Sequence, residues 1–164
     1  MNSRKQLNST LVGLGKLTND NELDFDLLPS LVGYNLRRAQ LSVFNDFAKT
    51  MGSAQITPGQ FGVITLIAAN PGMTQSALAR AVGIERSTMV AVIDALESRG
   101  LVERRASPAD RRSYALVPSS DGIALLERLK PMVLEHENRV AANLSFEERR
   151  QLVQLLSRLI QDGV

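Results

Sequence analysis

The sequence predicts a mainly α-helical fold that carries one small β-hairpin. Through most of the chain, apolar residues recur at three- and four-residue steps, the spacing of one face of an α-helix. Between two such helical stretches lie two short apolar runs, joined by a polar segment that contains a proline. The predicted order is therefore helix, helix, short helix, helix, hairpin, long helix and helix.

The composition limits the possible classes of protein. The 164 residues suffice for one domain or one domain with helical extensions. With 19 basic against 17 acidic residues, any nucleic-acid site has to come from local clustering of charge. Cysteine is absent, which excludes disulfides, thiolate metal sites and thiol redox sensors. No segment resembles a signal peptide or a membrane span, so we expect a cytoplasmic protein.

The N-terminal part of the chain divides into a polar segment and a helix. Residues 1–26 are asparagine-rich and show little periodicity, so we expect a flexible arm. Residues 27–56 contain a helix from Pro29 to Met51 with two adjacent apolar stripes. An arc of this width is more than a helix needs to cover one core.

Residues 57–118 form the predicted central domain. A helix begins at Pro58 with Thr57 as its N-cap, and a short helix begins after Thr74. A longer helix follows over about residues 85–99. The short and the longer helix can pack as a helix-turn-helix.

A helix-turn-helix has recognisable packing requirements. Two helices that cross at roughly 90–120° need a small residue at the crossing and a glycine in the turn. Ala79 and Gly83 occupy these positions, and Leu78, Met89 and Leu96 supply an inner apolar face. The complete set predicts a DNA-binding helix-turn-helix, whereas a plain helical hairpin would show only parts of it.

The predicted hairpin resembles a DNA-binding wing. Residues 101–106 and 113–118 form its strands, and its turn is flanked by four arginines: Arg104, Arg105, Arg111 and Arg112. Arginine suits a narrow minor groove because its guanidinium is planar and weakly hydrated. Asp110 can accept a hydrogen bond from Arg112 and hold it extended. The alternative is a solvated turn whose Asp–Arg pairs contribute little.

Side chains outside the apolar stripe of the second helix should face the groove, namely Arg86, Ser87, Thr88, Val90 and Ala91. Arg86 can bond to guanine O6 and N7. Ser87 and Thr88 can reach a phosphate or a base edge. Val90 and Ala91 can contact a thymine methyl group. The sequence therefore predicts a reading surface with little charge.

Four polar residues lie at the margins of this surface. Gln75 and Ser76 begin the short helix and can bond to phosphate together with its N-terminal amides. Glu85 and Asp94 would repel phosphate, so we expect both to point away from DNA. Of the strand arginines, we assign only Arg105 to the DNA surface.

The C-terminal part, residues 119–164, contains two predicted helices. Ser119 or Ser120 caps the first, and Pro131 lies inside it, so we expect a kink or a break there. Ser145 starts the second helix with a capping box, and leucines recur at helical spacing to its end.

With these elements in place, the chain resembles the MarR family of winged helix-turn-helix regulators over about residues 30–162. The most specific matches are "LESRGLVERR" followed by "DRRSYAL", and "VPSSDG" before the next helix. The resemblance implies a homodimer, held by its first and last helices, that binds a palindromic operator. It also matches Asp110 and Arg112 to the family's wing aspartate and minor-groove arginine. Ala91 departs from the basic residue of many members, so base contacts cannot be carried over there.

The same resemblance implies an effector site. "GYNLRRAQ" is similar to the stretch in family members that control hydroxycinnamate catabolism and sense hydroxycinnamoyl-CoA thioesters or related acids. The candidate lining residues are Tyr34, Arg37, Arg38, Phe44, Phe61 and Ile64. A buried arginine needs a negative partner, which could be Asp46, another carboxylate or an anionic ligand. The alternative is a structural ion pair or an arginine that reaches solvent.

The sequence therefore predicts a ligand-responsive repressor that binds double-stranded DNA as a homodimer and is released by a small aromatic or anionic effector. The alternative is a constitutive or architectural DNA-binding protein without an effector. No enzyme activity, cofactor or metal is expected, because nucleophile–histidine, metal and dinucleotide motifs are missing. We expect the single histidine, His136, on a helix surface.

Overall fold

In a computed structural model of the chain, the described residues are 23–106 and 114–160. The chain divides into two compact units, Met1–Phe44 and Asn45–Val164, and helix α2 (Val32–Thr50) passes from the first to the second. Helices predominate in both units, and three short strands form one sheet. The predicted fold class is confirmed. No helix in these two described ranges is long and apolar enough to cross a membrane.

The N-terminal unit consists of a 3-10 turn, η1 (Leu28–Ser30), followed by the first part of α2. The Asn35 side-chain amide joins them, since it donates to the carbonyls of Pro29 at 2.9 Å and Leu31 at 2.8 Å. Most apolar side chains of this unit are exposed, as at Leu23, Leu27, Leu28, Leu31, Val32, Leu36, Leu41 and Phe44. Among the described residues, this unit therefore has a wide exposed apolar surface.

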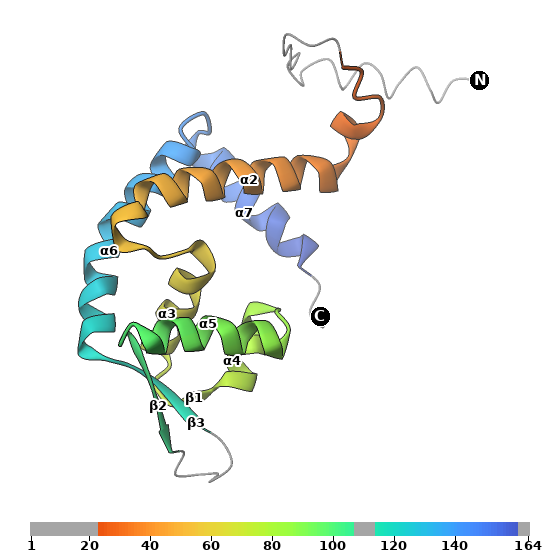
Figure 1. The fold of residues 1–164 in the computed structure, drawn as a ribbon. Coiled ribbons are helices and arrows are strands. Elements are labelled where there is room, and N and C mark those ends of the chain that lie inside the picture. Colours follow the sequence, from red (N-terminus) through yellow and green to blue (C-terminus); the bar gives the residue numbers. More distant parts are fainter. Residues whose placement is uncertain (1–22, 107–113, 161–164) are drawn as a thin grey trace. The chain divides into compact units, whose positions relative to one another are not determined.

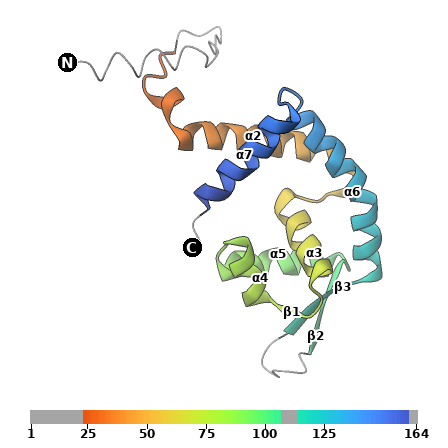
Figure 2. The same ribbon diagram turned by 180° about the vertical axis from the view of Figure 1, so that it is seen from behind.

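In the second unit, a 3-10 turn η2 (Gly52–Ala54) leads from α2 into a winged domain. Its elements are α3 (Pro58–Ala69), β1 (Met73–Thr74), α4 (Gln75–Val82), α5 (Arg86–Ser98), β2 (Val102–Ala106) and β3 (Tyr114–Pro118). Both views show the three strands beside α4 and α5 (Figures 1 and 2). The sheet is antiparallel with order β1-β3-β2, and Leu116 pairs with Met73 on one side and Arg104 on the other.

The hairpin β2–β3 is as predicted, but β1 is an addition to the predicted fold. Strand β1 has only two residues, which is too short for an alternating pattern to be visible. Its pairing with β3 connects the beginning of α4 to the wing. The start of the helix-turn-helix is thereby held against the hairpin.

The core lies between α3, α4, α5 and the sheet. Its fully buried side chains include Ile64, Ile67, Leu78, Met89, Ile93, Leu96 and Leu116. Helix α3 is apolar on nearly all sides because it packs against α4, α5, α6 and β3 together. Leu78, Met89 and Leu96 therefore fill the helix-turn-helix core as predicted, whereas Val82, which was also expected at the junction, is exposed.

The predicted helix caps are confirmed. Thr57 and Gln60 form a capping box at α3, where the Gln60 amide donates to Thr57 Oγ1 at 3.2 Å. Thr74 Oγ1 accepts from the Ala77 amide at α4, again at 3.2 Å. Gly83 ends α4 at φ 71°, a left-handed conformation that suits glycine. Local side-chain chemistry thus sets the ends of these helices.

Helices α6 (Ser120–Val140) and α7 (Phe146–Leu159) complete the unit. Ser119 is the N-cap of α6. Of the expected kink or break at Pro131, the break does not occur, since α6 is continuous; the helix curves along its length (Figure 2). Proline costs one backbone hydrogen bond, and the burial of Leu126 and Leu129 stabilises the helix on its N-terminal side.

Candidate DNA-binding site

The helix-turn-helix presents one uncovered face of α5. The Ile84 amide donates to the Ala79 carbonyl at 3.1 Å and closes the turn between α4 and α5. Met89, Ile93 and Leu96 point into the core. The five predicted groove residues are all exposed: Arg86, Ser87, Thr88, Val90 and Ala91. Of these five side chains only Arg86 is charged, and the exposed carboxylate of Asp94 lies one turn after Val90.

The two strand arginines have different surroundings. Arg104 is 20% exposed and bonds to two α5 carboxylates, Asp94 at 2.5 Å and Glu97. Arg105 is 63% exposed and bonds to Glu103 of its own strand, with Arg105 Nη2 and Glu103 Oε2 separated by 2.8 Å. Arg104 is thus a link between the wing and α5, and Arg105 faces solvent.

Electrostatics keep Arg104 firmly charged. Burial lowers the pKa of its guanidinium, but the hydrogen bond to Asp94 and the charges of Asp94 and Glu97 outweigh burial and raise that pKa. Asp94, which we expected to point away from DNA, is engaged by this arginine. The remaining predicted wing residues, Asp110, Arg111 and Arg112, lie outside the described residues.

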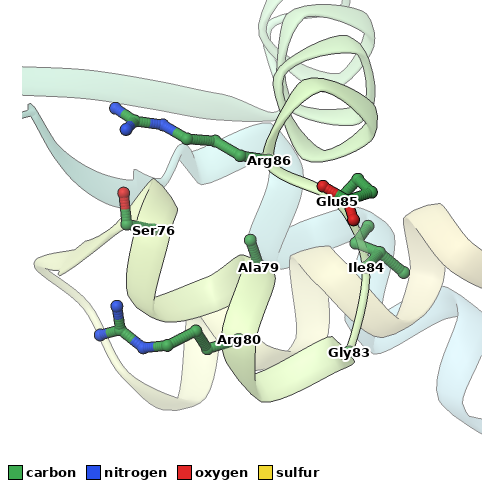
Figure 3. A pocket seen from close by; sticks show the side chains of 7 residues that line it. All are labelled: Ser76, Ala79, Arg80, Gly83, Ile84, Glu85 and Arg86. Carbon is green, nitrogen blue, oxygen red and sulfur yellow. The ribbon is translucent and has the colours of Figure 1, made fainter. Parts of the chain in front are cut away.

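One side of α4 and the turn before α5 line an open hollow of about 640 Å³. Ser76, Arg80 and Arg86 are among its lining residues, and Figure 3 shows their polar ends directed to the same side. Glu85 lies at the other end of the hollow (Figure 3). Arg80 is a residue that sequence reasoning missed. Its four-residue spacing from Ser76 on one helix face was the available signal.

Arg99, a second arginine that the sequence analysis did not single out, holds the C-terminal end of α5 in place. The Arg99 guanidinium donates to the carbonyls of Gln55 at 2.6 Å and Ala54 at 2.8 Å. Gln55 adopts a left-handed conformation with φ 49° in the link between α2 and α3. The C-terminal end of the reading helix is therefore bound to the segment that follows α2. No local pattern could reveal a contact across this sequence distance.

The expectation of a surface histidine is wrong. His136 is 1% exposed, and its Nδ1 lies 2.7 Å from Asp46 Oδ2. Its ring meets the edge of Phe47 with 5.4 Å between centroids. Arg139 also bonds to Asp46, at 3.0 Å. Hydrogen bonds from His136 and then Arg139 lower the pKa of Asp46.

The predicted effector residues occur in both units. In the N-terminal unit, the Arg38 guanidinium carbon lies 5.6 Å from the Tyr34 ring centroid, and both Arg37 and Phe44 are exposed. In the second unit, Phe61 is half-buried and Ile64 is fully buried in the core. Asp46, one possible partner for these arginines, is occupied by His136 and Arg139.

A helix-turn-helix followed by a basic hairpin, with an uncovered face on its second helix, defines a winged helix-turn-helix DNA-binding protein. The sequence pattern of the MarR family matches residues 56–114. A putative transcriptional regulatory protein for the hcr operon of Thauera aromatica is 40% identical over 148 residues, 88% of this chain and 89% of that protein. The chain therefore belongs to the MarR family, and it is a transcriptional regulator rather than an enzyme.

Solved structures support the same assignment. The transcriptional repressor CouR bound to a 23-mer DNA duplex matches with a TM-score of 0.81 and 43% identity, over 86% of this chain and 100% of that chain. CouR bound to p-coumaroyl-CoA matches with a TM-score of 0.80 and 40% identity, over 87% and 100%. The family resemblance and the winged helix-turn-helix fold predicted from the sequence are confirmed.

Proposed function

We propose that this protein is a repressor that binds a palindromic operator as a homodimer and releases it when an aromatic acyl-CoA binds. The observation that carries the proposal is the exposed face of α5 beside a basic wing, on which the one carboxylate, Asp94, is paired with Arg104 of the wing. The likeness to CouR supports the effector class, because CouR has been solved both with DNA and with p-coumaroyl-CoA. We place the protein in the cytoplasm, where it meets DNA and acyl-CoA.

For DNA contact we propose eleven residues in three groups: Gln75 and Ser76 at α4; Arg86, Ser87, Thr88, Val90 and Ala91 at α5; and Arg105, Asp110, Arg111 and Arg112 in the wing. The wing supplies most of the positive charge. The face of α5 supplies apolar and hydroxyl contacts, which suit thymine methyl groups and base edges. Two such sites in a dimer would double the contact area on a palindromic operator.

The dimer is proposed from uncovered apolar surface. All described residues of α7 are at least partly exposed, including four of its large apolar side chains: Leu152, Val153, Leu155 and Leu159. A monomer rarely exposes so much contiguous apolar surface. We propose that residues 27–56 and 119–164 form the dimer interface, while residues 57–118 bind DNA and residues 1–26 form an arm.

For the effector we propose an acyl-CoA whose phosphates meet Arg37 and Arg38 and whose aromatic group meets Tyr34, Phe44 and Phe61. Exposed arginines suit phosphates, and aromatic side chains suit a hydroxycinnamoyl ring. Ile64, the remaining predicted lining residue, is fully buried in the core against which Phe61 packs.

The test begins with a binding sequence selected from a random DNA pool. Fluorescence anisotropy then measures release of this DNA on addition of p-coumaroyl-CoA, with free coenzyme A and p-coumaric acid as controls. Release by the thioester alone supports the proposal. DNA affinity that is unchanged by all three compounds supports the alternative, a constitutive DNA-binding protein without this effector. Arg38→Gln should weaken the response to the thioester while leaving DNA affinity unchanged in its absence.

A further inference from the structure

The hollow between α4 and the turn before α5 brings together three hydrogen-bond donors from two helices. Ser76 and Arg80 lie one turn apart on α4, and Arg86 is the first residue of α5. Figure 3 shows the two guanidinium groups on either side of the Ser76 hydroxyl. A phosphate group offers several acceptor oxygens, so donors that converge from two or three directions suit it well.

The charge of these arginines is not neutralised locally. Within residues 23–106 and 114–160, neither Arg80 nor Arg86 has a carboxylate oxygen within 4.0 Å. In contrast, Arg104 and Arg105 of the wing are both paired with carboxylates. The Glu85 carboxylate lies away from the guanidinium groups, at the other end of the hollow (Figure 3). The donor side of the hollow is therefore free to accept an anion.

The direction of the Arg86 side chain decides between two roles. As the first residue of α5, Arg86 would bond to a guanine edge if its side chain pointed away from α4 and into the groove. Figure 3 instead shows this side chain directed toward the beginning of α4, on the side of Ser76. Arg86 therefore joins α4 in one donor group rather than the reading face of its own helix.

We propose that Ser76, Arg80 and Arg86 form a clamp for one backbone phosphate of the operator. The clamp sets the register of α5 in the groove, and it leaves base reading to the residues that follow Arg86. This inference rests on the proposed DNA-binding function and adds Arg80, a contact that the predicted site lacks. It also changes the role of Arg86 from reading guanine to binding phosphate.

The salt dependence of DNA affinity tests the clamp. Each phosphate contact releases condensed counterions, so log K falls with log salt by about 0.9 per contact. Because the proposed dimer has two clamps, Arg80→Gln and Arg86→Gln should each make this slope shallower by up to about 2, that is by up to about 1 per subunit. Each should weaken binding to selected and scrambled DNA by the same factor. Arg80→Lys keeps the charge and should keep the slope.

A matched control is Arg150→Gln on α7, which removes an arginine charge outside the helix-turn-helix. Arg150 pairs with Glu147 on α7, and its two-residue spacing from Leu152 places it opposite the apolar stripe. Its substitution should leave the slope unchanged. Circular dichroism should show that all four variants unfold at the wild-type temperature, because these side chains are exposed.

Three results would overturn the clamp. If the slope of log K against log salt is the same for Arg80→Gln as for wild type, the hollow holds no phosphate, although the proposed function still stands. If the sequence selected by Arg86→Gln changes at one base position, Arg86 reads a base. If Arg80→Gln loses affinity for p-coumaroyl-CoA and not for DNA, the hollow binds the phosphates of the effector instead. Failure of the wild type to bind any DNA would contradict the proposed function itself.

Discussion

Arg104 on β2 donates a hydrogen bond to Asp94 on α5 over 2.5 Å, and the same guanidinium also bonds to Glu97. The Arg104 backbone amide adds a bond to Glu97 Oε1 at 3.3 Å. A single residue thus ties the first wing strand to the reading helix. The contact also neutralises Asp94, whose negative charge would otherwise repel the DNA backbone.

Replacement of Arg104 by methionine should loosen this link. We expect a loss of about 1 kcal/mol in the free energy of unfolding, since both carboxylates are partly exposed and such pairs contribute modestly. The loss in binding free energy for DNA should exceed the loss in unfolding free energy, because two carboxylates become unpaired beside the reading surface. Urea unfolding and anisotropy titration measure the two effects. Arg105→Met is the control, and a larger destabilisation by Arg105→Met would contradict the assignment.

The contact between His136 and Asp46 predicts an acid-sensitive region. The pKa of Asp46 is lowered in the folded chain, so its ionised form stabilises the fold at pH values above its ordinary pKa of 3.8. This stabilisation is lost as the pH falls through 3.8 and then through the lowered folded value. Thermal unfolding should therefore show a loss of stability at acid pH.

Asp46→Asn isolates this contribution. The variant should be less stable than wild type near neutral pH, and its melting temperature should fall less steeply between about pH 5 and about pH 2. Thr50→Val is the comparison, because it removes a neighbouring Arg139 contact and leaves the carboxylate in place. If the melting temperatures of Asp46→Asn and wild type fall in parallel over this pH range, the role of Asp46 is refuted.

The helix-turn-helix and its caps could be predicted because they depend on nearby residues. Thr57, Thr74 and Ser145 each bond within four residues, and Gly83 ends α4 through its own backbone conformation. His136 could not be placed in the same way, since its partner Asp46 lies 90 positions away. Charged neighbours on both sides made α6 look like a surface helix at this point.

The arginines show the same division between local and distant contacts. Alternation along β2 predicts that Arg104 and Arg105 face opposite sides, but only tertiary packing decides which of them meets α5. Arg80 could have been found, because its spacing from Ser76 is a property of one helix. Arg99 binds carbonyls 44 and 45 positions away, for which the sequence carries no signal.

Gly122 predicts a strong effect of adding one methyl group. Gly122 lies in the first turn of α6. A Cβ atom at this position would lie 2.1 Å from the Leu101 carbonyl oxygen. Since that oxygen belongs to the backbone, Gly122→Ala should cost about 2–3 kcal/mol of unfolding free energy. Gly62→Ala in α3 is the control, because its Cβ would meet nothing within 4 Å. Equal urea midpoints for the two variants would contradict the expected clash.

Arg112 provides a test of the wing that does not depend on α5. Since a wing arginine is proposed to enter the minor groove, Arg112→Ala should weaken operator binding by about 5- to 150-fold, that is by about 1–3 kcal/mol. The variant should remain folded and dimeric. A mobility-shift titration at fixed salt measures the change. Wild-type affinity in this titration would remove the wing from the proposed site.

The apolar face of α7 predicts the dimer. Leu155 and Leu159 lie one turn apart and are each about half exposed in the single chain. Glutamate at both positions should place two charges in the proposed interface. The double variant Leu155→Glu, Leu159→Glu should therefore sediment as a monomer and lose most of its operator affinity.

The control for this surface is Arg150→Gln, on the opposite side of the same helix, which should remain dimeric. Because the leucines are not part of the buried core, the doubly substituted chain should keep its helical circular dichroism spectrum. Sedimentation of the doubly substituted chain as a dimer would exclude α7 as the interface. The exposed apolar residues of the N-terminal unit, with Leu36 and Leu41 among them, would then be the next surface to substitute.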